Sequence, residues 1–372
     1  MKKICFVVSS PLTAISFLKE PINRLSKFYE IFLVVNLNGT DVNLLRDLPL
    51  KRIIHFKIER KINIINDFIC LIRLINFFRK NKYDAIHSLS PKAGFISMLA
   101  GYLSNIPTRV HTFTGQVWST KKGIFRFILK KIDSLTSYCS TELLTDSESQ
   151  LIFLRRQGFK KKINIFGNGS ICGVSLNRFK PSNIERKNQR KKFKILDRET
   201  VFMFLGRINK DKGVIDLIEA FKKIDTNSFL CSLYLIGKDE DEIGSMYQSN
   251  YSNIHFLPHE KNPENILQAC DVFCLPSYRE GFGVSIIEAS ALEKPIICSD
   301  VYGLQDTIIE GETGLRHRVG DIYHLKQKIE FTLLNPKKIK KMGVKGRVYV
   351  TKNFDQLLVL DEWEDFYRKI LK

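Results

Sequence analysis

Apolar residues in this chain form short continuous runs that alternate with longer stretches of helical spacing. The first series is a run at 3–8, a helically spaced stretch at 12–28 and a second run at 31–35. Continuous apolar runs are typical of strands covered on both faces, so this order predicts a β-α-β unit with parallel strands. The alternation continues with expected strands at 53–56, 85–88, 109–112, 143–146 and 162–166, and expected helices at 64–80, 91–104, 123–136 and 148–157.

A second series follows a turn-rich and then basic stretch. Residues 186–194 are predicted to form a solvated surface helix next to the connection between two domains. Beyond it we expect strands at 201–205, 231–236, 254–257, 271–275 and 295–298, and helices at 214–224, 263–269, from 321 onward and at 356–372. The predicted fold class is therefore α/β, with two doubly wound, Rossmann-like domains that face each other across a cleft.

Length supports this division, because single cores rarely grow past about 250–300 residues and this chain has 372. The expected domains are 1–170 and 171–355, and the amphipathic helix 356–372 can cross back to the first domain. Ligands of such sheets bind at the carboxyl ends of the strands. The loops that follow the strands are therefore the places to look for chemistry.

The chain is strongly basic, with 59 Lys and Arg residues against 39 Asp and Glu residues and a formal net charge of +20. Such an excess indicates an anionic partner, which could be nucleic acid, an anionic membrane surface or a phosphorylated substrate. A compositional bias that only aids solubility is the alternative. We expect no nucleic-acid partner, since no zinc-finger, RNP-type or helix-turn-helix signature is found.

Cysteine spacing and hydropathy limit the possible environments. The eight cysteines are scattered without Cys-x-x-Cys pairs, which argues against zinc and disulfide frameworks and for a reducing compartment. The apolar start of the chain is short and is predicted to be a strand, not a signal peptide. Asp67 and Arg73 interrupt the apolar helix 62–78, so we expect a soluble or peripheral protein without a membrane span.

The stretch 276–297 carries the strongest chemical signal. An apolar run ends at Pro276, a loop with Gly281 and Gly283 follows, and helical spacing resumes at Val284. A glycine-containing loop that leads into a helix N-terminus presents free N–H groups and suits a phosphate. Two carboxylates flank it, Glu280 and Glu288 (the latter within the helix), and carboxylates suit hydroxyl groups. A ligand with phosphate in the middle and hydroxyl groups at both ends is a nucleotide-sugar.

A second strand-loop-helix motif lies at 204–214. Arg207 and Lys212 follow Gly206 at the carboxyl end of the expected strand. Cations fixed there would stabilise the negative charge that grows on a departing diphosphate. The alternative is that they are ordinary exposed cations beside a helix.

These two motifs together resemble the family 4 retaining glycosyltransferases of GT-B fold. The resemblance covers essentially the whole chain and is strongest from Gly206 to Leu315, including Gly237 and the loop from Gly303. It implies a donor such as a UDP- or GDP-sugar, which is a substrate, and no further cofactor. It also implies front-face attack with retention of configuration, in which the leaving phosphate helps to deprotonate the acceptor and no protein nucleophile is needed.

The resemblance also implies roles for individual residues. Arg207 and Lys212 would hold the diphosphate, and Glu280 would contact the donor sugar or support the reacting centre. Glu288 would bind the ribose hydroxyls. Backbone groups at the donor would come from Gly206, Phe282, Gly283 and Val284.

The N-terminal half is expected to bind the acceptor. The loop 111–118 resembles the Thr-Gly loop of bacterial polysaccharide-assembly members, in which many relatives have His directly before the glycine. Here Thr114 precedes Gly115 and His111 stands earlier, so either His111 or Thr114 could contact the donor sugar. Lys92, in the loop before another helix, is a weaker candidate for a phosphate contact. Members of this family frequently have a Gly-Gly loop after the first strand. Ser9-Ser10-Pro11 stands there in this chain, and the difference affects how the acceptor approaches the site.

Two further features bear on partners. Asp239-Glu240-Asp241 has the composition of a metal motif, but it is predicted to be a solvated acidic turn, and no metal is expected. Segments 121–131 and 155–162 combine cations with apolar residues, which predicts peripheral attachment to the inner face of the cytoplasmic membrane.

The function expected from this sequence is retaining transfer of a sugar to a saccharide acceptor, expected to be polyprenyl-diphosphate-linked, in O-antigen or capsule assembly. The alternatives are transfer to a soluble small molecule, a nucleotide-sugar epimerase of the same fold, and a basic nucleic-acid-binding protein.

Overall fold

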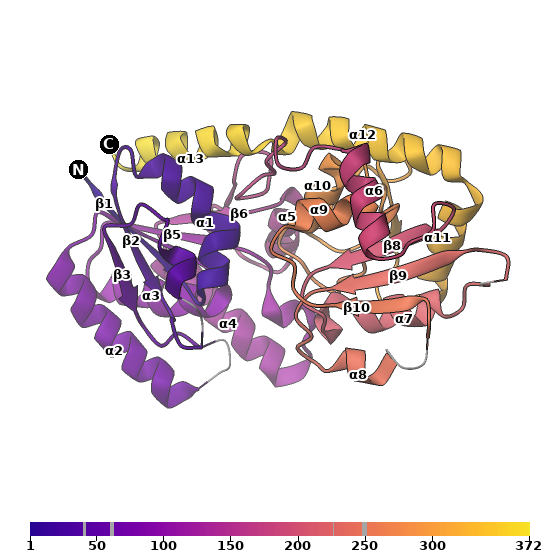
Figure 1. The fold of residues 1–372 in the computed structure, drawn as a ribbon. Coiled ribbons are helices and arrows are strands. Elements are labelled where there is room, and N and C mark those ends of the chain that lie inside the picture. Colours follow the sequence, from indigo (N-terminus) through magenta and orange to yellow (C-terminus); the bar gives the residue numbers. More distant parts are fainter. Residues whose placement is uncertain (40–41, 60–62, 226, 248–250) are drawn as a thin grey trace. The chain divides into compact units, whose positions relative to one another are not determined.

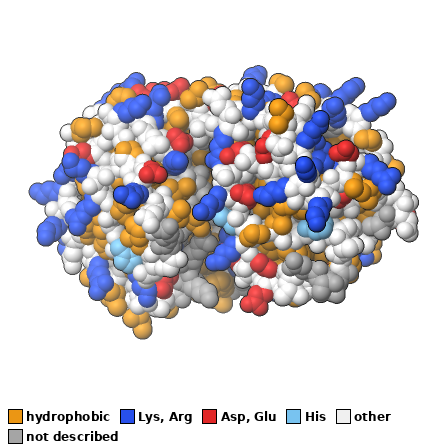
Figure 2. Space-filling view, in the orientation of Figure 1, with side chains coloured by type: hydrophobic (Ala, Val, Ile, Leu, Met, Phe, Trp, Pro, Cys, Tyr) orange, Lys and Arg blue, Asp and Glu red, His pale blue; other side chains and the backbone are white. Residues whose placement is uncertain are grey.

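The computed structural model describes residues 1–39, 42–59, 63–225, 227–247 and 251–372. It consists of two compact units (Figure 1). The N-terminal unit comprises Met1–Cys172 and Leu357–Lys372, and the C-terminal unit comprises Gly173–Gln356. These divisions lie within two residues of the boundaries at 170 and 355 that the sequence suggested. Figure 2 shows Lys and Arg side chains spread over the visible face of both units.

The N-terminal unit is built on a sheet of seven strands in the order β3-β2-β1-β4-β5-β6-β7, and every pairing is parallel. The strands are β1 (Lys3–Val8), β2 (Glu30–Val35), β3 (Arg52–His55), β4 (Ala85–Leu89), β5 (Thr108–Phe113), β6 (Glu142–Thr145) and β7 (Asn164–Ile165). The helices are α1 (Pro11–Leu25), α2 (Ile64–Asn81), α3 (Pro91–Leu103), α4 (Gly123–Cys139), α5 (Glu148–Arg156) and α13 (Gln356–Ile370), with short 3-10 turns η1 (Val42–Leu45) and η2 (Val117–Thr120).

Alternating residues of β1 show how this sheet is covered on both faces. Ile4, Phe6 and Val8 belong to a buried cluster with residues of α1 and α13. Cys5 and Val7 belong to a second cluster with residues of α2 and α3. Successive side chains of a strand point to opposite faces, so a continuously apolar strand is the expected result of helices on both sides.

The last helix, α13, packs within the N-terminal unit. The indole N–H of Trp363 donates to the carbonyl of Ile171 at 2.8 Å, and the Tyr367 hydroxyl lies 2.8 Å from Nδ1 of His87. Arg24 on α1 donates to Glu364 at 2.8 Å. These contacts, together with burial of both aromatic rings, hold the end of the chain to the first sheet.

The C-terminal unit repeats the same topology. Its six strands are parallel and have the order β10-β9-β8-β11-β12-β13. They are β8 (Thr200–Leu205), β9 (Cys231–Ile236), β10 (Ile254–Leu257), β11 (Val272–Leu275), β12 (Ile296–Ser299) and β13 (Gly314–His317). The helices are α6 (Asn183–Lys192), α7 (Val214–Phe221), α8 (Ile243–Tyr247), α9 (Pro263–Ile266), α10 (Val284–Ala291), α11 (Ile322–Leu334) and α12 (Pro336–Phe354), with 3-10 turns η3 (Lys210–Lys212) and η4 (Leu267–Ala269).

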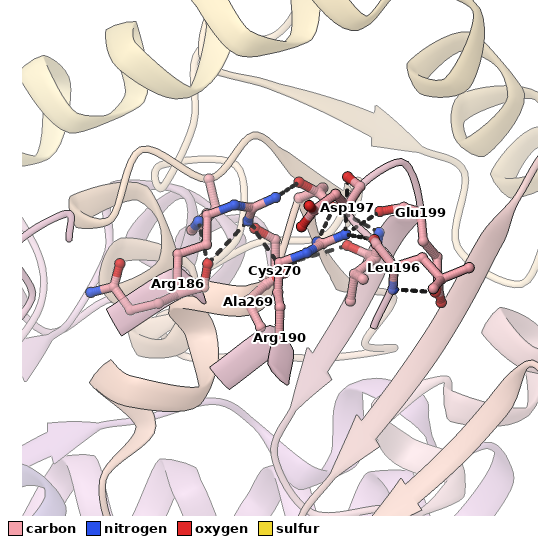
Figure 3. A network of polar contacts seen from close by, with 11 residues as sticks. Arg186, Arg190, Leu196, Asp197, Glu199, Ala269 and Cys270 are labelled. Atoms are coloured by element: carbon pink, nitrogen blue, oxygen red, sulfur yellow. Dashed lines mark hydrogen bonds and ion pairs between the residues drawn. The ribbon is translucent and has the colours of Figure 1, made fainter. Parts of the chain in front are cut away.

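The basic stretch in α6 is not the fully solvated surface that the sequence suggested (Figure 3). The Arg186 guanidinium donates to the carbonyls of Gln268, Ala269 and Cys270 at 3.0–3.3 Å. Arg190 is only 5% exposed and pairs with Asp271 at 3.1 Å. Two arginines therefore satisfy carbonyl oxygens at the end of η4, just before β11 begins, and fix α6 to the sheet.

Two other expectations need correction. β13 lies inside the stretch that the sequence predicts to be part of a loop motif, because its four residues, Gly314–His317, contain one large apolar side chain and give no apolar run. The expected strand at 162–166 is reduced to the two residues of β7. Among the described residues, no helix combines the length and the apolar composition that crossing a membrane requires.

Candidate active site

The centre of the second sheet is the place where its strand order reverses. β8 and β11 are neighbours there, and the chain leaves them through the loops 206–213 and 276–283. Ligands of doubly wound sheets bind at such a switch point, outside the carboxyl ends of the strands. Both motifs that the sequence singled out therefore lie at the expected position in the fold.

Glycines allow these loops to touch through their backbones. A Cβ on Gly213, which has φ +69°, would lie 2.0 Å from the carbonyl oxygen of Pro276. A Cβ on Gly237 would lie 1.8 Å from the carbonyl oxygen of Gly206, and one on Gly303 would lie 2.5 Å from that of Gly281. No side chain fits at these three positions without moving a neighbouring loop. The structure therefore joins the loops after four strands into one surface.

Lys212 and Glu280 meet in this surface. The Lys212 ammonium forms an ion pair with Oε1 of Glu280, and the Ser277 hydroxyl donates to the same oxygen at 2.8 Å. The Lys212 side chain is 19% exposed and that of Glu280 is 13% exposed. No partner for Oε2 of Glu280 is found within the described residues, which leaves this oxygen able to accept a bond from a ligand hydroxyl.

Arg207 lies on the other flank of the β8 loop. Its guanidinium donates to Glu240 at 2.8 Å and its side chain is 43% exposed. Asn209 connects this pair to Lys212, because its amide donates to Glu240 at 2.9 Å while its carbonyl oxygen accepts from the Lys212 backbone N–H at 3.1 Å. Among the described residues, the Arg207 side chain forms no hydrogen bond or ion pair with the 276–283 loop.

The acidic triplet after Gly237 forms an exposed turn at Glu240 and Asp241, as the sequence suggested, and also has a structural role. Asp239 accepts from the backbone N–H groups of Ile243 and Gly244 at 3.0 and 2.7 Å, which caps α8. Glu240 binds the β8 loop as above, and Asp241 accepts from the backbone N–H of Lys210 at 2.9 Å. Across the described ranges, no group of three or more His, Cys, Asp and Glu side chains is placed to hold a metal ion.

The start of α10 offers backbone donors. The Phe282 ring packs inward against Phe354, with the ring centroids 5.1 Å apart, and Gly283 precedes the first helical residue, Val284. In the described part of the chain, no acceptor is present for the backbone N–H groups of Phe282, Gly283 and Ser285. Donors at a helix N-terminus carry partial positive charge, so this turn can hold an anion.

Glu288 follows one turn later on the same helix. Its carboxylate is half-buried and forms no hydrogen bond with any described residue. Burial raises the pKa of Glu288 to about 7, against an ordinary value of 4.5, and the neighbouring Arg178 opposes this shift. A half-buried carboxylate without a partner can accept hydrogen bonds from the hydroxyl groups of a ligand.

His111 lies in the N-terminal unit near the end of β5. Its ring is 1% exposed, and Nδ1 lies 2.9 Å from the Ser88 hydroxyl. A Cβ on Gly94 would lie 2.3 Å from the ring, so α3 packs directly on it. Burial lowers the pKa of His111 to about 3, and the imidazole is therefore neutral near pH 7. It can act as a neutral hydrogen-bonding group but not as a cation.

The loop after β5 is held by α5. Gly115 has φ +99°, and Thr114 before it is half-buried. With the amide nitrogen of Gln150 facing Asp146 and the Phe113 carbonyl, its amide oxygen accepts from the Gly115 N–H at 2.7 Å. Lys92, on the first turn of α3, pairs with Asp67 at 2.7 Å. The weaker candidate for a phosphate contact is thus already partnered by a carboxylate.

Two residues of the site were missed by sequence reasoning. Asn209 is 7% exposed and links Arg207 to Lys212, and Ser277 orients Glu280. Asn209 lies between Arg207 and Lys212, and Ser277 precedes Glu280 by three residues, so both lie inside the two motifs. Their small polar side chains gave the available signal, because such side chains in glycine-containing loops commonly bind neighbouring backbone or carboxylate groups.

The chain has two doubly wound units with parallel strands, and the second has a charged site suited to phosphate at its switch point. This combination is that of a transferase of the GT-B class. The chain belongs to the group 1 glycosyl transferases: residues 185–349 match the family described as "Glycosyl transferases group 1". It is 33% identical to a capsular polysaccharide biosynthesis glycosyltransferase of Staphylococcus aureus, over 84% of each chain. The predicted class of enzyme, a glycosyltransferase of the capsule and O-antigen type, is confirmed.

Other relatives carry more specific names. The chain is 26% identical, over 88% of each chain, to an N,N'-diacetylbacillosaminyl-diphospho-undecaprenol alpha-1,3-N-acetylgalactosaminyltransferase of Campylobacter jejuni. It is 29% identical to a UDP-Gal:alpha-D-GlcNAc-diphosphoundecaprenol alpha-1,3-galactosyltransferase of Escherichia coli, over 66% of this chain and 65% of that one.

Solved structures agree on the fold. Sucrose-phosphate synthase from Thermosynechococcus elongatus superposes with a TM-score of 0.83 at 20% identity. The superposition covers 100% of this chain and 99% of the synthase. HepE of Anabaena, in complex with UDP and glucose, superposes with a TM-score of 0.81 at 17% identity. The superposition covers 99% of this chain and 100% of HepE. The predicted GT-B fold is confirmed.

Proposed function

We propose that this enzyme transfers a sugar, with retention of configuration, from a nucleoside-diphosphate sugar to a polyprenyl-diphosphate-linked saccharide during assembly of a surface polysaccharide. The observation that carries the proposal is the contact between Lys212 and Glu280. It joins a cation suited to phosphate and a carboxylate suited to sugar hydroxyls, beside the free N–H groups at the start of α10. A UDP- or GDP-sugar presents matching groups, and the molecule acts as substrate, without a further cofactor or metal.

The donor would span the surface formed by the two loops. Its diphosphate would lie between the Lys212 ammonium and the N–H groups of Phe282 and Gly283, and Gly206 and Val284 would border it. The free oxygen of Glu280 would accept from a sugar hydroxyl, and Glu288 would accept from the ribose hydroxyls. Arg207, which is 43% exposed, can exchange its bond to Glu240 for a phosphate oxygen with little change in burial.

The chemical step follows from this placement. The bond between the anomeric carbon and the diphosphate oxygen breaks as a bond from an acceptor hydroxyl oxygen forms on the same face. The hydroxyl proton passes to the departing phosphate oxygen, so no protein nucleophile is required. Negative charge grows on the diphosphate, and the Lys212 ammonium stabilises it more in the transition state than in the ground state.

The acceptor is proposed from the relatives and from the N-terminal unit. Two relatives are named for acceptors carried on diphosphoundecaprenol. We assign the acceptor to the loop of Thr114 and Gly115. His111 is proposed to support this loop as a neutral group through Ser88. Because that acceptor is a membrane lipid, we also propose peripheral attachment at the inner face of the cytoplasmic membrane, through the basic and apolar residues of α4.

A transfer assay tests the proposal. Purified enzyme is incubated with radiolabelled nucleoside-diphosphate sugars and a panel of saccharides linked to a short isoprenyl diphosphate, and the product is followed into the lipid phase. The expected result is label on the acceptor for one donor, with the anomeric configuration kept by NMR. Release of epimerised nucleotide-sugar without transfer would support the epimerase alternative, and labelling of a soluble sugar would support the small-molecule alternative.

Two binding measurements complete the test. A nucleoside diphosphate should raise the melting temperature, whereas duplex DNA at the same ionic strength should not; the reverse result would favour a nucleic-acid-binding protein. Flotation with anionic liposomes at low salt tests attachment to the membrane, and the enzyme is expected to float with the vesicles. Absence from the vesicle fraction would contradict the membrane part of the proposal alone.

A further inference from the structure

The N-terminal unit contains an apolar cavity that plays no part in the site described above. Its volume is about 550 Å³, and its walls come from α2, α3, α4 and the segment after β5, with Phe68, Leu71, Phe95, Phe125, Leu129 and Ile132 among them. The polar side chains in these walls already have partners. Lys92 pairs with Asp67 at 2.7 Å, and the Trp118 indole N–H donates to Asp133 at 2.7 Å. The cavity therefore suits an apolar ligand.

The position of the cavity connects it to the acceptor loop. α3 begins directly after β4, and Val117 and Trp118 follow β5, so the cavity lies at the carboxyl edge of the first sheet. Ligands of doubly wound sheets bind at this edge. The segment 114–118 carries Thr114 and Gly115 at one end and forms a cavity wall at the other.

The helices that border the cavity also expose apolar side chains to solvent. On α2, Ile64 is 79% exposed and Phe68 is 63% exposed. On α4, Ile124 is 72% exposed and Phe127 is 55% exposed. Hydrophobic side chains reach the surface over the part of this unit that carries α2 (Figures 1 and 2). An exposed apolar patch that is continuous with a cavity marks an interaction site for an apolar partner.

Positive charge accompanies this apolar surface. The Arg126 guanidinium and the Lys130 ammonium lie 5.3 and 5.7 Å from the centre of the Trp118 ring. Lys122, which precedes α4, and Lys131 on α4 are exposed. Within the residues that the structure describes, no carboxylate forms an ion pair with any of these four cations. A ligand with an apolar chain and an anionic head would complement both features.

We infer that the cavity binds the isoprenoid chain of the lipid-linked acceptor, with the cations of α4 complementing the charge of its diphosphate. This inference rests on the proposed function, since a polyprenyl diphosphate joins a long apolar chain to an anionic head. On this inference the enzyme has its own binding site for the isoprenoid chain of the acceptor, and this site is separate from the attachment of the enzyme to the bilayer. The enzyme would then distinguish acceptors by the lipid as well as by the saccharide.

A single chain and a bilayer would contact different residues. A bilayer pressed against α2 and α4 would contact their exposed apolar side chains whether or not these line the cavity. An isoprenoid chain would contact those that line it, such as Phe68 and Phe125, and not Ile72 and Ile128. All four side chains are between 43% and 63% exposed, so replacing them tests contact without removing core packing.

The first experiment measures binding without catalysis and without a membrane. Trp118 forms part of the cavity wall, so a dansyl-labelled farnesyl diphosphate should show energy transfer from tryptophan when it binds. Unlabelled farnesyl diphosphate should displace the probe, and inorganic diphosphate at the same concentration should not. Displacement by inorganic diphosphate to the same extent would overturn the inference, since the head group alone would then account for binding.

The second experiment uses matched double variants. Phe68→Asp combined with Phe125→Asp should weaken probe binding at least about tenfold, since each methylene removed from water adds to the binding free energy. Ile72→Asp combined with Ile128→Asp adds the same charge on the same helices outside the cavity, and should weaken binding less than about twofold. Melting temperatures establish that both variants are folded. Equal effects of the two pairs would overturn the inference and assign the apolar face to the bilayer.

The third measurement compares kcat/KM for a saccharide diphosphate carrying a farnesyl chain with that for one carrying a methyl group. The wild type should prefer the farnesyl acceptor at least about tenfold, and the cavity variant should lose this preference. Equal use of both acceptors would reject the chain site while leaving the transferase proposal intact. Probe binding in the cavity without transfer to either acceptor would instead reject the proposed function and keep the chain site.

Discussion

The two units have the same strand order, yet their switch points are built from different groups. In the C-terminal unit the loops after β8 and β11 touch through Gly213 and the Pro276 carbonyl, and they carry the pair of Lys212 and Glu280. In the N-terminal unit the loops after β1 and β4 approach through the hydroxyls of Ser9 and Ser90, 3.5 Å apart. One topology thus places an ion pair and free amide groups between the switch-point loops of one unit, and a pair of hydroxyl groups between those of the other.

This difference matches the two substrates that the proposed reaction requires. A diphosphate needs cations and N–H donors that are fixed before it binds, and close packing of glycine-containing loops fixes them. An acceptor on a lipid chain needs little charge at the reacting hydroxyl and an apolar surface for the chain. The fold supplies two equivalent positions, and the loop residues decide which substrate each position takes.

The largest expected effect tests the charged switch point. Lys212→Ala should lower kcat by about 10²–10³, which corresponds to about 2.7–4 kcal/mol in the barrier, because the ammonium acts on charge that develops in the transition state. The measurement is steady-state transfer at saturating donor. Lys210→Ala, which removes an exposed cation from the same loop, is the control and should change kcat less than about twofold. Wild-type turnover of the Lys212 variant would remove this residue from the mechanism.

A second prediction concerns the backbone contact that joins the two loops. Gly213→Ala should lower the free energy of unfolding by roughly 2–4 kcal/mol, since its Cβ would lie 2.0 Å from a carbonyl oxygen at a positive φ. Gly311→Ala is the control, because Gly311 has φ +75° and nothing within 4 Å of the added Cβ. It should cost about 1 kcal/mol. Equal costs in chemical denaturation would mean that the loops separate easily.

The sequence was informative about these sites because their signals are local. Apolar runs predicted every strand of both sheets except β13, and the glycine-containing loops identified Lys212 and Glu280, which the structure brings into contact. The ion-pair partners were not predictable in the same way. Arg207 pairs with Glu240, from the loop after β9, and this choice depends on how Gly237 packs against Gly206.

Other failures have the same physical origin. The helix α6 is rich in Lys and Arg from Arg186 onward, so its composition predicted a solvated face. Tertiary packing instead directs Arg186 to the carbonyls that precede β11. Burial also decides the state of His111, since it keeps the ring neutral, and the sequence position near a strand end gave no signal of this.

A third prediction uses the raised pKa of Glu288. Ribose hydroxyls should donate to its carboxylate, so donor affinity should increase about tenfold as the pH rises through about 7. Stability should change in the opposite direction. The folded state holds a proton on Glu288 that the unfolded state releases above pH 4.5, so the stability that this proton provides is lost as the pH rises from 4.5 through about 7.

The control for this prediction is Glu288→Gln, which keeps the shape and removes the titration. Its donor affinity should be independent of pH between 5 and 8, and its stability relative to the wild type should increase over the same range. Calorimetric titration with the nucleoside-diphosphate sugar, whose doubly substituted diphosphate keeps its charge over this range, and melting curves at each pH provide both measurements. An identical pH dependence in the two proteins would exclude Glu288 from the donor site.

The smallest expected effect tests the switch point of the N-terminal unit. His111→Gln should change kcat/KM by about threefold or less, because a positioning group acts through Ser88 and not on the reacting atoms. The wild type should lose stability as the pH falls below 6.5, since the folded-state pKa of about 3 lies below the unfolded value, and the variant should lose less. A fall in kcat of more than about a hundredfold would instead place the His111 ring at the donor sugar, as one interpretation of the sequence proposed. The two switch points would then share the chemistry, and their separation into a donor side and an acceptor side would no longer hold.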